Sequence, residues 1–171
     1  MFDSDPTYLV TAVVLGYLLG SIPFGLLLTR MVGLGDVRDI GSGSIGATNV
    51  LRTGSKLLAL LTLALDSGKG AAAALAACYL APSLAPVAAV AAVVGHLFPV
   101  WLRFDGGKGV ATTLGALVIL SWPVGLATGL TWLLCAVIFR ISSLSSLSSI
   151  ALSPAFAWYL SEPPVTIAAA I

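Results

Sequence analysis

The chain has 171 residues, of which 58% are hydrophobic and only 9% are charged, with a mean hydropathy of +1.06 and a formal net charge of +1. Soluble domains average about 25% charged residues, so this chain lacks the charge to cover a soluble surface. The weak net charge also excludes a typical nucleic-acid-binding protein, and the two cysteines lie in apolar runs without metal-site spacing. The composition predicts an all-α, polytopic integral membrane protein.

Apolar stretches of suitable length occur along the whole chain, since a spanning helix needs about 20 mostly apolar residues. In chain order they cover residues 8–29, 57–80, 84–102, 110–121, 124–139, 147–160 and 165–171. The fourth stretch is short for a span, and the seventh reads as the start of a helix. We therefore expect about seven transmembrane helices in a single domain over residues 1–171, some of them short or broken. We also expect a natural C-terminal tail beyond Ile171.

Basic residues alternate between the links that join these stretches. Those outside the stretches follow the first, third and fifth: Arg30, Arg38, Arg52, Lys56, Arg103, Lys108 and Arg140. The links after the second, fourth and sixth stretches contain no Lys or Arg. Cytoplasmic links are enriched in Lys and Arg. The pattern predicts that the N-terminus lies outside and that the basic links lie in the cytoplasm.

The first link contains a dense run of glycine and hydroxyl residues at 41–49, flanked by Arg38 and Arg52. Glycines let backbone N–H groups approach an anion closely, and arginine supplies forked donors to phosphate oxygens. A flexible polar linker is the alternative interpretation, but such a linker has no need of Ile45 and Val50 or of flanking arginines. The pattern favours an anion site.

A second glycine-rich turn, Gly106-Gly107-Lys108-Gly109, precedes the apolar stretch that begins at Val110. It lacks the upstream glycine of a Walker P-loop. Free N–H groups at the start of the following helix would favour an anion at the turn, and Lys108 would add a positive charge. A short cytoplasmic turn with one topology-setting lysine explains the fragment equally well.

Ionisable residues also occur inside the stretches. Asp66 and Lys69 are three residues apart and share a helix face. Ionisable groups at membrane depth are costly and suggest a function, but a structural ion pair, or a helix break favoured by Gly68 and Gly70, is an alternative. His96, the single histidine, is either a packing residue or part of the site.

Two further polar stretches are better explained by packing. Residues 20–25, Gly-Ser-Ile-Pro-Phe-Gly, predict a kink and close helix contact within the first stretch. The serine-rich run at 142–149 follows Arg140 and predicts polar helix packing, although it could extend an anion pocket.

Taken together, these motifs resemble those of the bacterial acyl-phosphate-dependent glycerol-3-phosphate acyltransferase family, PlsY. The resemblance covers about residues 16–147, and its motifs are 20–25, 41–52, Asp66-x-x-Lys69-Gly70, Gly95-His96-x-Phe98-Pro99 and 106–112. It implies a seven-helix enzyme of the bacterial cytoplasmic (inner) membrane with its active site facing the cytoplasm. The implied reaction transfers a fatty acyl group from acyl phosphate to the 1-hydroxyl of glycerol 3-phosphate, giving lysophosphatidic acid and inorganic phosphate.

The resemblance also implies roles for individual residues. The catalytic candidates are Ser42, Arg52, Lys108 and His96. The substrate-binding candidates are Gly41, Gly43, Gly46, Thr48, Asn49, Gly106, Gly107 and Ser143. Ser44 stands where the family usually has asparagine. The expected partners are acyl phosphate, glycerol 3-phosphate and membrane lipids, with no cofactor, metal, nucleic acid or obligate protein partner.

The runner-up hypothesis is a transporter or channel for a small phosphorylated metabolite. Broken helices and anion sites at helix ends also suit that class, although no inverted repeat is visible. A non-catalytic membrane scaffold is a third interpretation, and it leaves the glycine- and arginine-bearing link unexplained.

Overall fold

The computed structural model describes residues 6–160 and Pro164. Every regular element in this part of the chain is a helix, which confirms the all-α prediction. The α-helices are α1 (Pro6–Gly20), α2 (Phe24–Met31), α3 (Ala47–Val50), α4 (Lys56–Leu80), α5 (Ala85–Leu97), α6 (Val110–Leu120), α7 (Trp122–Phe139) and α8 (Ser142–Tyr159). Short 3₁₀ turns cover Val37–Asp39, Leu51–Thr53, Pro82–Leu84 and Val100–Leu102.

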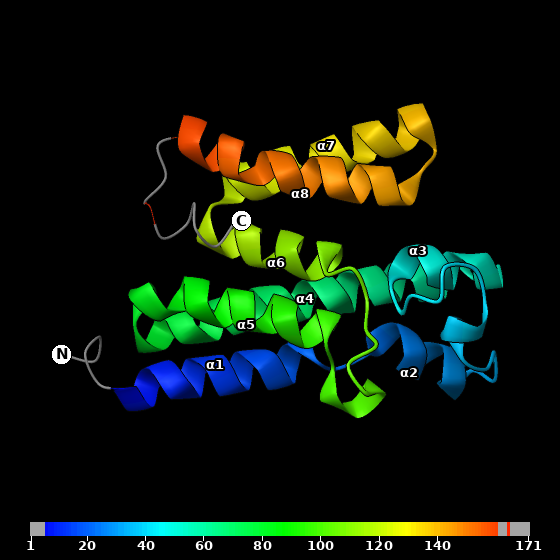
Figure 1. Cartoon of the computed structure of the whole chain (residues 1–171), viewed down its shortest axis with the longest axis horizontal. Coiled ribbons are helices and arrows are strands. Elements are labelled where there is room, and N and C mark those ends of the chain that lie inside the picture. The colour runs from blue at the N-terminus through cyan, green and yellow to red at the C-terminus, as the bar shows by residue number, and fades with distance from the viewer. Residues whose placement is uncertain (1–5, 161–163, 165–171) are drawn as a thin grey trace.

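The long helices pack side by side in a bundle (Figure 1). Helix α1 lies along α5, helix α4 contacts both α5 and α6, and α7 joins α6 to α8. Small residues permit the close contacts. A Cβ at Gly20 would overlap the carbonyl of Ala92, and one at Gly95 would overlap the carbonyl of Tyr17. Helices α1 and α5 therefore meet backbone to backbone, as small-residue membrane helices do.

The first predicted stretch, 8–29, is broken rather than continuous. Helix α1 ends at Gly20 and α2 starts at Phe24. Pro23 has no N–H to extend the first helix, so carbonyl groups at the break need other donors. Lys69 of α4 donates to the carbonyl of Ile22 at 2.7 Å, and Trp101 donates to the Ser21 hydroxyl at 2.8 Å. The kink and close packing predicted for 20–25 are confirmed.

The second predicted stretch is unbroken, so the helix break considered at Gly68 and Gly70 is wrong. Helix α4 runs from Lys56 to Leu80, and the Ser55 hydroxyl caps its start by accepting the Leu58 N–H at 3.3 Å. Gly70 is needed for packing instead, because a Cβ there would overlap the carbonyl of Thr112 on α6.

Within residues 6–160 and Pro164, four stretches are long and apolar enough to cross a membrane: 6–31, 56–80, 82–102 and 122–139. Helix α6 has only 11 residues, about 16 Å at 1.5 Å per residue, roughly half of the hydrocarbon core. The sixth stretch was predicted at 147–160, but α8 begins earlier, at Ser142. The seventh, 165–171, lies outside the described residues, so the number of seven spans stays a prediction.

The early start of α8 places its serines inside a helix. Ser145, Ser146 and Ser149 are buried, and their hydroxyls donate to carbonyls of the preceding turn at 2.8–3.1 Å. These bonds satisfy the hydroxyls within the helix itself. The expectation of polar helix packing is confirmed, and Trp132 of α7 adds a bond to the Ser146 hydroxyl at 3.3 Å.

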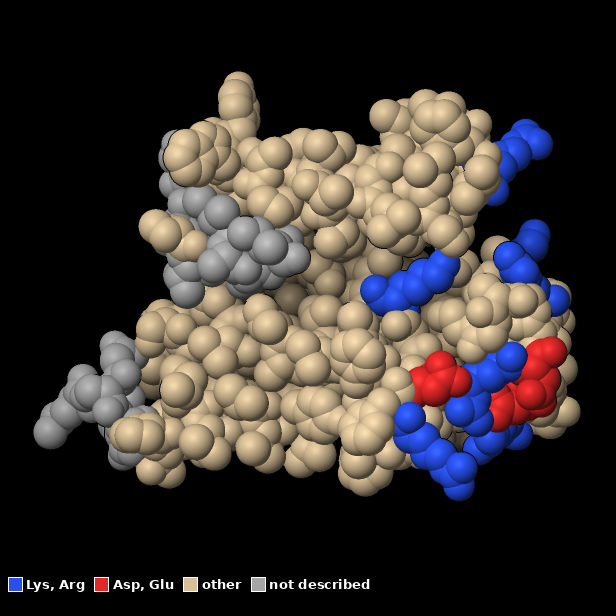
Figure 2. All heavy atoms as spheres, in the orientation of Figure 1, with Lys and Arg blue, Asp and Glu red and all other residues tan. Residues whose placement is uncertain are grey.

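Charged side chains gather at one end of the bundle, over the α2–α4 link, the α5–α6 loop and the α7–α8 turn (Figure 2). The three basic links therefore share one end, as the alternation of charge predicts. Large exposed aromatic residues mark the opposite end, where α4 and α8 finish and α7 starts: Tyr79, Trp122, Trp158 and Tyr159. Aromatic residues of this kind favour membrane–water interfaces.

Replacing two glycines of α4 with alanine should change the stability of the protein in opposite directions. We expect Gly70→Ala to lower the free energy of unfolding by about 1–3 kcal/mol, because its methyl group would push α6 away. Gly68 faces open space, so Gly68→Ala should raise it by up to about 1 kcal/mol through better helix propensity. Thermal unfolding of both variants in detergent measures the difference, and equal effects would contradict this packing.

Candidate active site

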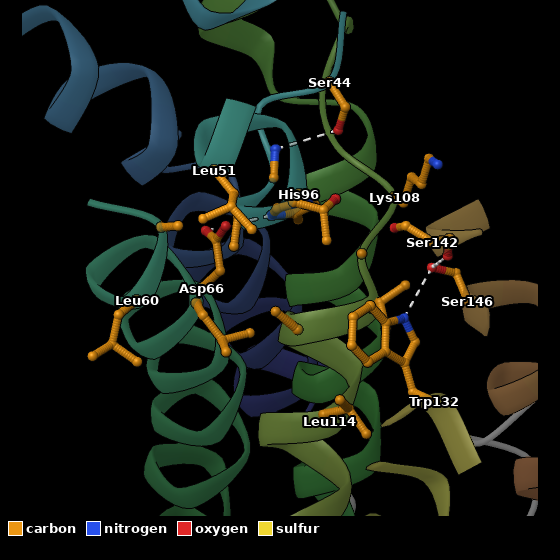
Figure 3. A pocket seen from close by; sticks show the side chains of 18 of the residues that line it. Ser44, Leu51, Leu60, Asp66, His96, Lys108, Leu114, Trp132, Ser142 and Ser146 are labelled. Carbon is orange, nitrogen blue, oxygen red and sulfur yellow. Dashed lines mark hydrogen bonds and ion pairs between the residues drawn. The ribbon is translucent and has the colours of Figure 1, made fainter. Parts of the chain in front are cut away.

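A cavity of about 500 Å³ opens between α4, α6, α7 and α8, beside the first link and the Lys108 turn (Figure 3). Its polar side is formed by Ser44, Thr48, Asp66, His96, Lys108 and Ser142. Its apolar side is formed by Leu60, Leu63, Leu114, Trp132 and Leu133. The cavity therefore offers one environment for charged groups and another for a hydrocarbon chain.

Asn49 holds the first link in shape. Its side-chain amide donates to the carbonyls of Val37, Ile40 and Ser44 at 2.7, 3.1 and 2.8 Å, and its Oδ1 accepts the Ser42 N–H at 3.0 Å. Asn49 is only 1% exposed. We predicted it as a substrate ligand, but its side chain binds the backbone of the link rather than facing the cavity. It therefore positions the link.

Arg52 lies over the glycine turn that Asn49 organises. Gly41 and Gly43 have φ angles of +57° and +71°, which favour glycine. A Cβ at Gly41 would overlap the Asn49 Oδ1 and lie 2.7 Å from Nη1 of Arg52. Within the described part of the chain, the Arg52 guanidinium has no hydrogen bond or ion pair, so it is available to an anion.

Arg38, the other flanking arginine, is already paired. Its guanidinium donates to both carboxylate oxygens of Asp36, at 3.0 and 2.7 Å, and Arg30 donates to the same carboxylate at 2.7 Å. The hydrogen bonds from Arg38 hold the pKa of Asp36 well below its usual range. The two arginines that flank the glycine run therefore differ: Arg38 stabilises the link, and Arg52 faces its turn with no ion-pair partner in the part of the chain that the structure describes.

This pairing predicts a pH dependence. Because the pKa of Asp36 is lowered by folding, its contribution to stability is present above the pKa of the unfolded chain, about 3.9, and is lost as the pH falls further. We expect the melting temperature of the protein to fall between pH 5 and pH 3, and to fall less in Asp36→Asn. Parallel thermal melts at the two pH values test this, and identical slopes would contradict it.

The second glycine turn folds back onto the end of α5. The Gly107 N–H donates to the His96 carbonyl at 3.0 Å, and a Cβ at Gly107 would overlap Nε2 of the His96 ring. A Cβ at Gly106 would overlap the His96 carbonyl. The ammonium of Lys108 then reaches α8, where it donates to the Ser143 hydroxyl at 2.7 Å. Two predicted residues that are 35 positions apart thus meet.

Asp66 is the site residue that the sequence analysis did not assign. Its carboxylate lies 2.8 Å from the Lys69 ammonium and 3.7 Å from Nδ1 of His96, and it lines the cavity. Asp66 and His96 belong to different helices, and no spacing rule connects residues that meet only through helix packing. Spacing along α4 predicted the pairing with Lys69, whereas the contact with His96 is visible only in the structure.

Of the predicted site residues, four line the cavity: Gly46, Thr48, His96 and Lys108. Ser143 is joined to them through Lys108. Gly41, Ser42 and Gly43 form the neighbouring turn, over which the Arg52 side chain lies, and Gly106 and Gly107 support the Lys108 loop. The structure thus gathers the predicted residues at one end of the bundle, around the first link and the Lys108 turn.

Comparison with known proteins gives a consistent result. The family model for glycerol-3-phosphate acyltransferase matches residues 10–171. The enzyme of that name from Paramagnetospirillum magneticum is 63% identical, with 95% of this chain and 81% of the relative covered. The Rhodospirillum rubrum enzyme is 58% identical, with 94% and 81% covered.

Comparison with solved structures supports the same family. A crystal structure of PlsY, an integral membrane glycerol 3-phosphate acyltransferase, in its glycerol 3-phosphate form has a TM-score of 0.89 at 36% identity. Its lysophosphatidic acid form has a TM-score of 0.86 at 34% identity. Each comparison covers 95% of this chain and 82% of the PlsY chain. The chain therefore belongs to the glycerol-3-phosphate acyltransferase family of bacterial integral membrane enzymes.

Proposed function

We propose that this glycerol-3-phosphate acyltransferase takes its acyl group from acyl phosphate, at an active site on the cytoplasmic side of the bacterial inner membrane. The 1-hydroxyl oxygen of glycerol 3-phosphate attacks the acyl carbonyl carbon, and the bond between that carbon and the phosphate oxygen breaks. The hydroxyl proton ends on the departing phosphate. The products are lysophosphatidic acid and inorganic phosphate.

The two-sided cavity is the observation that carries this proposal. Its polar side lies among the basic links, which the positive-inside pattern assigns to the cytoplasm. Its apolar side includes Leu60 and Leu133, which are 62% and 54% exposed on the flank of the bundle. A fatty chain can therefore leave the cavity sideways into the bilayer while its phosphate end stays among polar groups.

Two sets of donors can hold the two phosphate groups. Lys108 and Ser143 form one set, joined by their 2.7 Å hydrogen bond. Arg52 and the Gly41–Gly43 turn form the other, with the exposed hydroxyl of Ser42 as an added donor. Membrane lipids surround the apolar side. Acyl phosphate, glycerol 3-phosphate and lipid are thus the partners that the site suits.

Catalysis then depends mainly on positioning and on charge. Acyl phosphate carries a good leaving group, so the residues need to align the hydroxyl with the carbonyl and stabilise the negative charge that develops. The leaving phosphate or a substrate phosphate can accept the proton directly. His96, which lines the cavity, is the alternative first acceptor.

The direct test supplies the purified protein in detergent with glycerol 3-phosphate and either acyl phosphate or the corresponding acyl thioester. We expect lysophosphatidic acid and phosphate in equal amounts from acyl phosphate. Product formed from the thioester alone would contradict the donor. Uptake of glycerol 3-phosphate into liposomes without product would support the transporter hypothesis instead.

The side of the membrane on which the active site lies is tested with sealed vesicles and membrane-impermeant glycerol 3-phosphate. Inverted inner-membrane vesicles expose the cytoplasmic face and should form product, whereas spheroplasts should not. The opposite result would place the site outside.

A further inference from the structure

Asp66 and Lys69 of α4 and His96 of α5 form a buried group of ionisable side chains beside the cavity. Each is at most 3% exposed. Asp66 and His96 line the cavity, and Figure 3 shows both side chains between α4 and the turn that carries Lys108. The reaction proposed above gives Asp66 and Lys69 no role, although burying charges at membrane depth is costly.

Lys69 joins the Asp66 carboxylate to the backbone between α1 and α2. Its ammonium lies 2.8 Å from Oδ1 of Asp66, donates to the Ile22 carbonyl at 2.7 Å and lies 5.6 Å from the centre of the Phe24 ring. The ammonium therefore balances the Asp66 carboxylate and ties it to the break between α1 and α2.

The Asp66 carboxylate faces the His96 ring. Its Oδ1 lies 3.7 Å from Nδ1, which has no hydrogen-bond partner among the described residues. An unprotonated Nδ1 would set its lone pair against the carboxylate charge, whereas a proton on Nδ1 points an N–H dipole toward it.

We infer that Asp66 is a positioning residue that holds His96 in the tautomer with the proton on Nδ1, which leaves Nε2 as the hydrogen-bond acceptor. Nε2 of His96 packs against Gly107, the residue that precedes Lys108 in the sequence. The catalytic consequence rests on the proposed function. A proton taken from the glycerol hydroxyl at Nε2 forms an imidazolium that Asp66 stabilises, and the imidazolium returns the proton to the departing phosphate.

The tautomer can be measured directly, because His96 is the only histidine in the chain. The 171-residue chain, labelled with ¹⁵N-histidine and purified on a histidine-free tag, gives the NMR signals of one imidazole. In the neutral imidazole we expect the proton on Nδ1 and an unprotonated Nε2. Asp66→Asn should move the population toward the Nε2-protonated form.

Thr62→Val is the matched control. Thr62 is buried one turn before Asp66 on α4, and its hydroxyl donates to its own helix at the Leu58 carbonyl. This variant should keep the wild-type imidazole spectrum. A wild-type spectrum with Nε2 protonated, or an unchanged spectrum in Asp66→Asn, would overturn the inference.

Kinetics separate positioning from simple loss of an ion pair. Asp66→Asn should lower kcat about 10- to 100-fold, as loss of an orienting partner does in metal sites, with little change in KM. The double variant Asp66→Asn/Lys69→Met removes the unpaired ammonium, and we expect it to stay equally slow. Recovery of the wild-type rate would show that a buried lone Lys69 caused the loss and would overturn the positioning role.

The two proposals fail separately. Absence of acyl transfer from acyl phosphate, together with an Nδ1-protonated wild-type spectrum, would overturn the proposed donor and still support the placement of Asp66.

Discussion

Replacing Lys108 or Arg52 with alanine should lower the rate of acyl transfer by about 10²–10³-fold, the range observed when one donor to a developing oxyanion is removed. Both cations lie at the glycine turns, and neither has an acidic partner among the described residues. Each would therefore be free to hold a phosphate oxygen. Initial rates of lysophosphatidic acid formation at saturating acyl phosphate measure the effect.

Lys56→Ala is the matched control for these variants. Lys56 is an exposed cation at the start of α4, in the same link as Arg52, and it does not line the cavity. Its loss changes the overall charge equally but removes no proposed ligand, so we expect a rate within a few-fold of wild type. If Arg52→Ala and Lys108→Ala also stayed within that range, the proposed roles would be wrong.

Asn49→Leu should destabilise the protein strongly and abolish its activity. The substitution leaves three carbonyls and the Ser42 N–H without their partner, and an unsatisfied buried group costs about 1–3 kcal/mol. We expect the free energy of unfolding to fall by at least about 3 kcal/mol. Chemical unfolding in detergent, followed by an activity assay at low temperature, measures both effects.

Two comparison variants test the reason for that loss. Asn49→Asp keeps an oxygen for the Ser42 N–H but turns a second oxygen toward three carbonyls, so it should be almost as damaging. Ser55→Ala removes one capping bond at the start of α4 and should cost only about 1 kcal/mol. If Asn49→Leu cost no more than Ser55→Ala, Asn49 would not organise the link.

Several features of the protein follow from the sequence alone because they depend on local properties. The apolar lengths predict the long helices α4 and α7 within a few residues, since a membrane requires a continuous apolar stretch. Pro23 predicts the break between α1 and α2, because its missing N–H acts within one turn. The spacing of basic links predicts one charged end, and the ordered motifs predict the family.

Other features depend on contacts between distant residues. Arg38 and Arg52 flank the same glycine run and look equivalent in sequence. In the folded protein, however, Arg38 forms an ion pair with Asp36, whereas the Arg52 side chain lies beside Gly41. Asn49 resembles a ligand until its four hydrogen bonds to the link are seen.

The sequence by itself thus determined the membrane class, the main helices, the family and the residue types of the site. Only the tertiary structure decided which of those residues face the cavity and that Asp66 meets His96 across two helices. The physical reason is that hydropathy and helix propensity act over neighbouring residues. Ion pairs and hydrogen bonds between helices exist only after close packing has set which faces meet.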